Sequence, residues 1–127
     1  TEQTAVITEV ERTSEAEVYS FMVNELSEVV DLLSWEVEEP GRLGRGAAIQ
    51  LLGKVYLTRA YKPFANPLDF ELAAEQLDRI IDDPESPYEL LDSYTSVYDE
   101  NNQNNSEVIW AIQYGMDRNY IGGGNPQ

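Results

Sequence analysis

The residues that could carry chemistry in this chain are carboxylates, tyrosines and lysines, because its 127 residues include no histidine and no cysteine. This composition excludes Ser-His-Asp and Cys-His catalysis, a Cys/His zinc site, haem ligation and disulfide bonds. The 24 Asp and Glu residues could in principle supply a carboxylate pair for glycoside hydrolysis. So many acids form pairs by chance, however, and no pair lies in an evident pocket-forming context. We therefore expect that the chain is not an enzyme.

Alternating oxygen-bearing side chains suggest a calcium loop, but their spacing argues against one. They are Asp99, Asn101, Gln103 and Asn105. An EF-hand loop beginning at Asp99 needs glycine at its sixth position and an acid at its twelfth, where this chain has Asn104 and Trp110. We expect a solvated turn and no metal site. The glycine run at 122–124 has neither a Gly-Lys-Ser/Thr continuation nor a Rossmann spacing, so no phosphate site is predicted either.

The charge of the chain limits its partners. The formal net charge is −16, which repels phosphate backbones and anionic lipid head groups, so we expect no nucleic-acid partner. Five of the eight basic residues fall within 41–66, which contains no acid, and an acidic segment lies on either side. Side-by-side packing of these three segments would be stabilised by about 0–1 kcal/mol for each exposed ion pair.

The fold class predicted is mainly α, with three helices and then a short extended segment. The helices are expected over 15–34, from 44–46 to 61, and over 69–83, and alternating apolar residues predict extended chain over 107–114. Residues 88–99 could form a turn and a short helix. We expect one partial domain over 1–127, belonging to a longer protein, with a flexible N-terminal segment over 1–13 and a Gly-rich loop over 115–127.

Capping residues and apolar stripes define the first and third helices. Ser14 and Glu17 form a Ser-x-x-Glu capping pattern, and Asp69 is expected to cap the third helix. The apolar stripe of the first helix consists of Val18, Phe21, Met22, Leu26, Val29, Val30 and Leu33. That of the third helix consists of Phe70, Ala73, Ala74, Leu77, Ile80 and Ile81. Each stripe predicts a helix that buries one face.

The second helix is apolar around most of its circumference, which predicts a central position. Its Leu52-Gly53-x-x-Tyr56 string matches the first half of a tetratricopeptide repeat. Ala73, Leu77 and Ile80 follow with the spacing of the second half. We therefore predict tetratricopeptide-like antiparallel helix hairpins, with ordinary close packing of two helices as the alternative interpretation.

The chain resembles a central part of the SusD/RagB family in four stretches, taken in order. They are 41–57 (GRLGRGAAIQLLGKVYL), 73–81 (AAEQLDRII), Tyr88 with Leu90 and Tyr98, and 104–114 (NNSEVIWAIQY). The resemblance implies a tetratricopeptide-like helical core. For the full-length protein it implies a surface-exposed lipoprotein of the cell outer membrane, whose anchor is not in this chain. It also implies a polysaccharide, oligosaccharide or other nutrient as ligand, a SusC-type TonB-dependent transporter as partner, and no cofactor.

The resemblance also directs attention to ligand-binding residues near the C-terminus. A sugar packs its C–H face on an aromatic ring, and its hydroxyls need donors and acceptors. The candidates of these types are Asp117, Arg118, Asn119 and Tyr120, next to glycines that let the backbone approach a ligand. The alternative interpretation is a loop separated from the domain that it would contact in the longer protein.

Three aromatic residues have structural expectations. Trp110 and Tyr114 are expected in the core because they share a face of the extended segment with Val108 and Ile112. Trp35 could be either a packing residue or a partly exposed anchor.

The function predicted is a non-catalytic glycan- or nutrient-binding protein that delivers its ligand to the transporter, with this chain serving mostly as scaffold. The rival hypothesis is a tetratricopeptide-type scaffold for protein–protein interaction. It would require regularly repeated hairpins, whereas one hairpin and a half can be recognised. Apolar helix faces left without a partner further predict that the isolated chain either forms oligomers or needs solubilising charge, which its net charge of −16 supplies.

Overall fold

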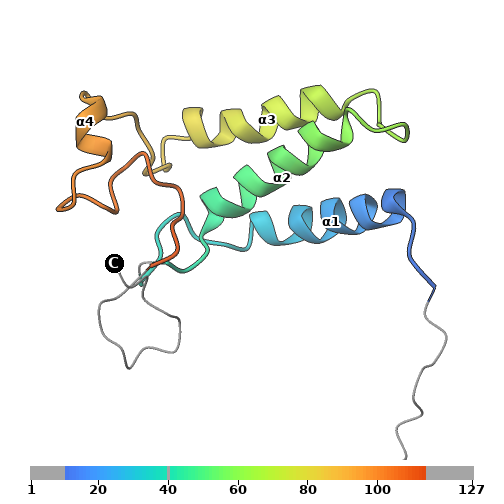
Figure 1. Ribbon diagram of the computed structural model, residues 1–127, viewed down its shortest axis with the longest axis horizontal. Coiled ribbons are helices and arrows are strands. Elements are labelled where there is room, and N and C mark those ends of the chain that lie inside the picture. The colour runs from blue at the N-terminus through green and yellow to red at the C-terminus, as the bar shows by residue number, and fades with distance from the viewer. Residues whose placement is uncertain (1–10, 40, 114–127) are drawn as a thin grey trace, which may run out of the picture.

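The computed structural model describes residues 11–39 and 41–113. These ranges contain four helices and no strand: α1 (Glu15–Val30), α2 (Arg45–Arg59), α3 (Asp69–Asp82) and α4 (Tyr94–Val97). Helix α2 lies between α1 and α3 in one layer, and the irregular chain with α4 lies beyond one end of α3 (Figure 1). The mainly α fold class is therefore confirmed. None of these helices is long and apolar enough to span a bilayer.

Helix α1 begins where the capping pattern predicts and ends earlier than expected. The Glu17 backbone N–H donates to Ser14 Oγ at 3.3 Å, and the Ser14 backbone N–H donates to Glu17 Oε2 at 3.1 Å. The helix stops at Val30 and does not continue to residue 34. Beyond that point the carbonyl of Leu33 accepts from Arg45 Nε at 2.7 Å and that of Ser34 from the Arg45 backbone N–H at 2.8 Å. These bonds belong to a turn that leads into α2.

Helix α2 is the central helix, as its apolar sequence predicts. Its buried residues are Gly46, Ala47, Ala48, Ile49, Leu52, Gly53, Val55 and Tyr56. Leu52 and Tyr56 share one core with Ala73 and Ile80 of α3, which is the packing expected of the hairpin. A Cβ at Gly53 would lie 3.1 Å from Leu77 Cγ, so glycine at this position lets α3 approach closely.

Helix α3 begins at Asp69, but Asp69 is not its cap, and this expectation was wrong. The capping position is Leu68, and Asp69 is the first helical residue. Its fully buried carboxylate accepts from Arg59 Nε at 3.0 Å, from Arg59 Nη2 at 2.5 Å and from the Asn66 backbone N–H at 2.8 Å. Hydrogen bonds from Arg59 hold the pKa of this carboxyl below its usual range. The ion pair therefore joins the end of α2 to the start of α3.

Two further ion pairs connect basic residues to α1 and to the residue that follows it. Lys62 Nζ lies 2.5 Å from Glu15 Oε1. Arg79 of α3 and Asp31, just after α1, form a second bridge across the layer at 2.5 Å. These pairs are partly or largely exposed, so each adds about 0–1 kcal/mol.

The segment predicted to be extended does not form a strand within 107–113. The expectation that Trp110 lies in the core was also wrong, because its side chain is 45% exposed and that of Ile112 61%. Ile109, from the opposite set of alternating positions, packs against the core instead. The Trp110 indole N–H donates to the carbonyl oxygen of Gly41 at 2.8 Å, which holds the ring at the surface. Tyr114 lies outside the described residues.

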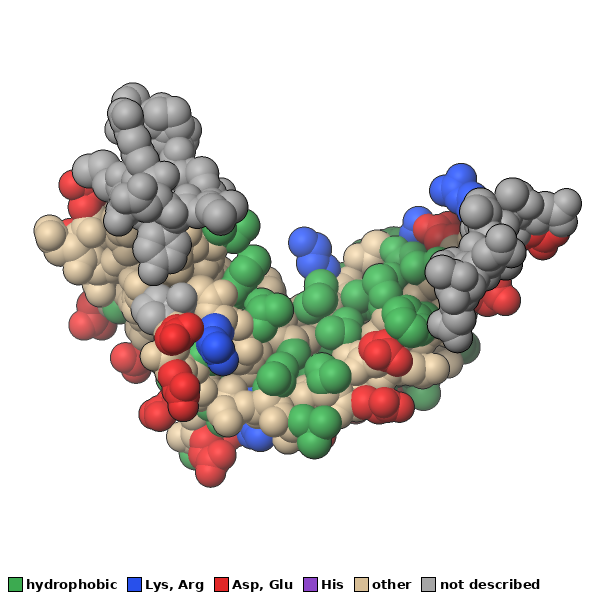
Figure 2. Space-filling model, turned by 90° about the horizontal axis from the view of Figure 1, so that it is seen from below, with side chains coloured by type: hydrophobic (Ala, Val, Ile, Leu, Met, Phe, Trp, Pro, Cys, Tyr) green, Lys and Arg blue, Asp and Glu red, His purple; other side chains and the backbone are tan. Residues whose placement is uncertain are grey.

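Two helix faces remain apolar and exposed. On α1, Val30 is buried and Leu26 packs against the core, while Val18 and Phe21 of the same predicted stripe are exposed. Seen from the side of α1, hydrophobic side chains gather among acidic ones (Figure 2). On α3, Phe70 and Ile81 are likewise exposed. Such faces agree with the oligomers expected of the isolated chain, which remain a prediction.

Candidate functional site

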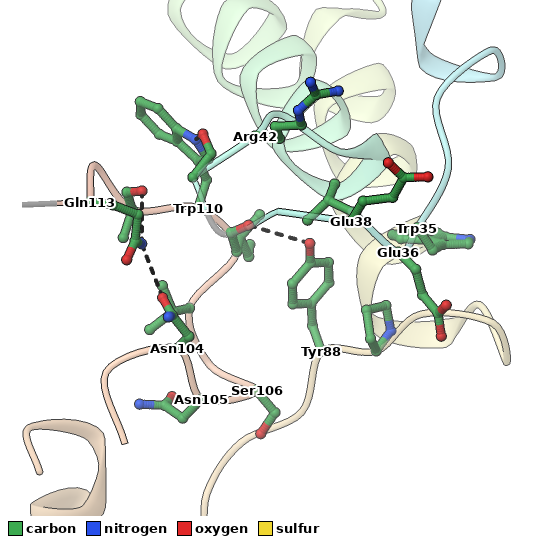
Figure 3. A pocket seen from close by; sticks show the side chains of 16 residues that line it. Trp35, Glu36, Glu38, Arg42, Tyr88, Asn104, Asn105, Ser106, Trp110 and Gln113 are labelled. Atoms are coloured by element: carbon green, nitrogen blue, oxygen red, sulfur yellow. Dashed lines mark hydrogen bonds between the residues drawn. The ribbon is translucent and has the colours of Figure 1, made fainter. Parts of the chain in front are cut away.

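The four predicted ligand contacts, Asp117, Arg118, Asn119 and Tyr120, lie outside the described residues. The described residues themselves form a hollow of about 610 Å³. Part of its lining, Gly41 and Arg42, lies just before the start of α2. Three segments line it: the connection from α1 to α2, the chain just after α3, and the stretch from 104 to 113. Figure 3 shows their side chains around a common space.

Aromatic residues contribute much of the apolar lining of the hollow, and two of them are Tyr88 and Trp110. Tyr88 packs its ring against Gly46 and lies edge-on to Trp35, with ring centroids 6.2 Å apart. Its hydroxyl donates to the Ile109 carbonyl oxygen at 3.3 Å, and partial burial raises the pKa of the phenol. Trp110 lines the hollow with its polar atom already bonded to Gly41. Its half-exposed ring is therefore available for an apolar contact.

The sequence left open whether Trp35 is a packing residue or a partly exposed anchor. Its side chain is buried, so Trp35 is a packing residue. Its ring contacts that of Tyr88 and also the guanidinium of Arg45, whose Cζ is 5.6 Å from the ring centroid. Trp35 thus joins the wall of the hollow to the helical core.

Amide and charged side chains complete the lining. Gln113 Nε2 donates to Asn104 Oδ1 at 3.0 Å, which joins two of these polar side chains (Figure 3). Glu36, Glu38 and Arg42 are the charged residues among the described lining residues. The arrangement offers a ring face, amide donors and acceptors, and carboxylate acceptors. This combination suits a polar ligand with an apolar face.

Three of the four calcium candidates, Asp99, Asn101 and Asn105, take part in hydrogen bonds of the neighbouring turn. Asp99 Oδ1 accepts from the Asn101 backbone N–H at 2.9 Å, an Asx turn. The buried Asn105 donates to the carbonyl oxygens of Val97 and Asn102. Within 11–39 and 41–113, no group of three acidic residues is placed to hold a metal ion. These side chains support the segment that carries Asn104.

The sequence did not reveal this hollow, because its walls come from segments far apart in the chain. Trp110 had been expected in the core, and Tyr88 appeared only as part of the family resemblance. A local signal exists at Gly46, near the start of the central helix, where glycine leaves room for a ring. That signal becomes interpretable only when the position of Tyr88 is known.

Replacing Gly46 by alanine is expected to destabilise the fold and disturb the hollow. A Cβ at this position would lie 2.9 Å from Tyr88 Cζ and closer still to Cε2, so the rigid ring must move. Overpacking of this kind costs about 1–3 kcal/mol, although alanine favours a helix over glycine by about 1 kcal/mol. Urea unfolding followed by circular dichroism measures the net change in the free energy of unfolding that these two effects produce.

The control is Gly53→Ala in the same helix. There the nearest atoms belong to the flexible Leu77 side chain, 3.1 Å away, so the neighbour can adjust. We expect this variant to unfold within about 1 kcal/mol of the unchanged chain. Equal losses for the two variants would contradict the packing of Tyr88 against Gly46.

Comparison with known proteins defines the family. The chain is 32% identical over 103 residues to a SusD-like protein of Bacteroides ovatus, an alignment that covers 79% of this chain and 18% of that protein. It is 29% identical over 108 residues to a SusD-like protein of Formosa agariphila, covering 84% of this chain and 19% of that protein. The chain belongs to the SusD-like family.

The chain spans about a fifth of the length of these curated relatives. No family model matches it, and no solved structure does.

Proposed function

We propose that this chain belongs to a non-catalytic nutrient-binding protein that captures a glycan at the cell outer membrane and delivers it to a SusC-type TonB-dependent transporter. The observation that carries the proposal is the similarity to two SusD-like proteins over about four fifths of the chain. The full-length protein would be a surface-exposed lipoprotein. In this scheme helices α1 to α3 are scaffold, and the hollow is the part of the scaffold that meets the ligand.

The hollow supports this proposal because its chemistry suits a sugar. A pyranose presents a C–H face that packs on an aromatic ring, and Trp110 offers a half-exposed ring. Sugar hydroxyls both donate and accept, and Asn104 and Gln113 provide amide groups for them. Gln113 also leads directly into the segment of Asp117, Arg118, Asn119 and Tyr120, which we propose as further contacts.

Isothermal titration with a panel of soluble oligosaccharides tests the role of the hollow. The replacement Trp110→Ala removes the ring face, and we expect it to weaken binding about tenfold, equivalent to about 1.4 kcal/mol. Leu90→Ala is the matched control, since Leu90 is 87% exposed and lies outside the hollow. Unchanged affinity in Trp110→Ala would remove the hollow from the binding site.

A second candidate function is a tetratricopeptide-type scaffold for protein–protein interaction. It is favoured by the exposed apolar faces of α1 and α3, including Phe21 and Ile81. Such a scaffold would bind a protein partner through these faces and would not bind sugars. Binding of a sugar that depends on Trp110 would favour the nutrient-binding proposal over this one.

A further inference from the structure

Acidic residues outnumber basic ones in the lining of the hollow, and this excess of negative charge favours some ligands over others. Its charged lining residues within the described chain are Glu36, Glu38 and Arg42, all of them exposed. Arg42 is already paired, because its Nε lies 3.3 Å from Glu39 Oε2. Glu36, Glu38 and Arg42 together carry a net charge of −1 at neutral pH, and Glu39, which lies outside the lining, brings this group of four residues to −2. The chain as a whole carries −16.

We infer that the hollow takes an uncharged, multiply hydroxylated ligand and rejects one of the same size that carries carboxylate or sulfate groups. The inference rests on the proposed function and names the class of ligand for the same site. A hydroxyl can donate to the carboxylates of Glu36 and Glu38, whereas an ionised carboxylate or sulfate has no proton to donate. An anion placed in the hollow would be repelled by these two carboxylates, because both belong to its lining.

The one cation of the lining does not reverse this preference. Arg42 shares its guanidinium with Glu39, so an anionic ligand would compete with a carboxylate of the chain itself. The net charge of the chain also repels anions at longer range and slows their approach, an effect that salt screens. Trp110, Asn104 and Gln113 can hold a neutral ligand without any charge on it.

Titration of matched ligand pairs tests the inference. The probes are glucose, galactose and mannose oligosaccharides in neutral form and with their C6 carbons oxidised to carboxylates. For the sugar that binds, we expect the oxidised form to bind at least about tenfold more weakly at about 0.02 M salt. At about 0.5 M salt the difference should shrink, while binding of the neutral form stays constant.

Charge variants separate a local effect from a global one. The double replacement Glu36→Gln with Glu38→Gln should reduce the difference in affinity between the neutral and oxidised ligands. Glu71→Gln with Glu75→Gln is the matched control, because it removes the same two charges from exposed positions on α3 outside the hollow. If the control double replacement reduces this difference in affinity as much, the carboxylates of the hollow do not select the ligand, and the inference is wrong.

The remaining outcomes distinguish this inference from the proposed function. Oxidised ligands that bind as tightly as neutral ones, with both weakened by Trp110→Ala, would overturn the ligand class and leave the hollow as the site. Sugar binding that Trp110→Ala does not affect, or no binding of any probe, would overturn the proposed function together with the inference. Selective binding of the neutral form, lost in Trp110→Ala, supports both.

Discussion

Replacement of Asp69 by alanine is expected to cost the fold about 3–5 kcal/mol, the usual cost of removing one partner of a buried ion pair. The Asp69 side chain is fully buried, and Arg59 opposite it is 13% exposed. Without the carboxylate, the guanidinium stays at the junction of α2 and α3 with its partner gone, and the Asn66 backbone N–H loses its acceptor. Urea unfolding monitored by circular dichroism measures the loss.

The control for Asp69 is Asp78→Ala, an exposed acid in the same helix. We expect it to change the free energy of unfolding by about 0.5 kcal/mol or less. A double-mutant cycle with Arg59→Met isolates the pair, because the loss from the second replacement should be smaller in the background of the first. Additive losses would show that the two side chains act independently.

The same ion pair predicts a pH dependence. Arg59 lowers the pKa of Asp69 in the folded state from an ordinary value of 3.8. A carboxyl with a lowered folded pKa stabilises the fold above its unfolded pKa, and this contribution is lost as the pH falls through the folded pKa. The stability difference between the unchanged chain and Asp69→Asn should therefore be constant near neutral pH and shrink below about pH 4. A difference that grows on acidification would contradict the assignment.

Ile49→Ala is the second replacement with a large expected effect, about 2–5 kcal/mol. Ile49 is fully buried at the centre of the helical core, where it belongs to one cluster with Val30 of α1 and Ala73 of α3. Truncation removes apolar contacts and leaves a cavity that three packed helices cannot easily close. The transition midpoint in urea should fall accordingly.

Leu51→Ala provides the comparison for Ile49. Leu51 lies two positions further along α2 and is 49% exposed, so the same truncation there should cost about 1 kcal/mol or less. Similar losses at the two positions would mean that α2 is not the central helix.

The helices were largely predictable from the sequence, because their signals are local. The capping pair of Ser14 and Glu17 marked the first residue of α1, and apolar periodicity placed α2 and α3 within a few residues of their observed bounds. The end of α1 was not predictable in the same way. It depends on Arg45, which binds the carbonyl oxygen of Leu33 from the next helix.

The contacts that define the candidate site were not predictable, because they join distant segments. An aspartate at the start of a helix predicts an N-terminal cap. Only the geometry of the preceding turn brings Asp69 to Arg59. Alternation from Val108 to Ile112 predicted a buried Trp110, but the hydrogen bond of its indole to Gly41 decides its position. That bond joins residues 69 positions apart in the sequence, so no local sequence pattern predicts it.

The most direct test of the central claim is a map of ligand contacts by amide and indole chemical shifts in the 127-residue chain. The chain has two tryptophans, so the two indole N–H signals can be separated. With a saturating neutral oligosaccharide, we predict shifts at the Trp110 indole and at amides within 36–42 and 104–113, and little change in α1 and α3. Shifts confined to the apolar faces of α1 and α3, or none at saturation, would contradict the claim that the hollow binds the nutrient.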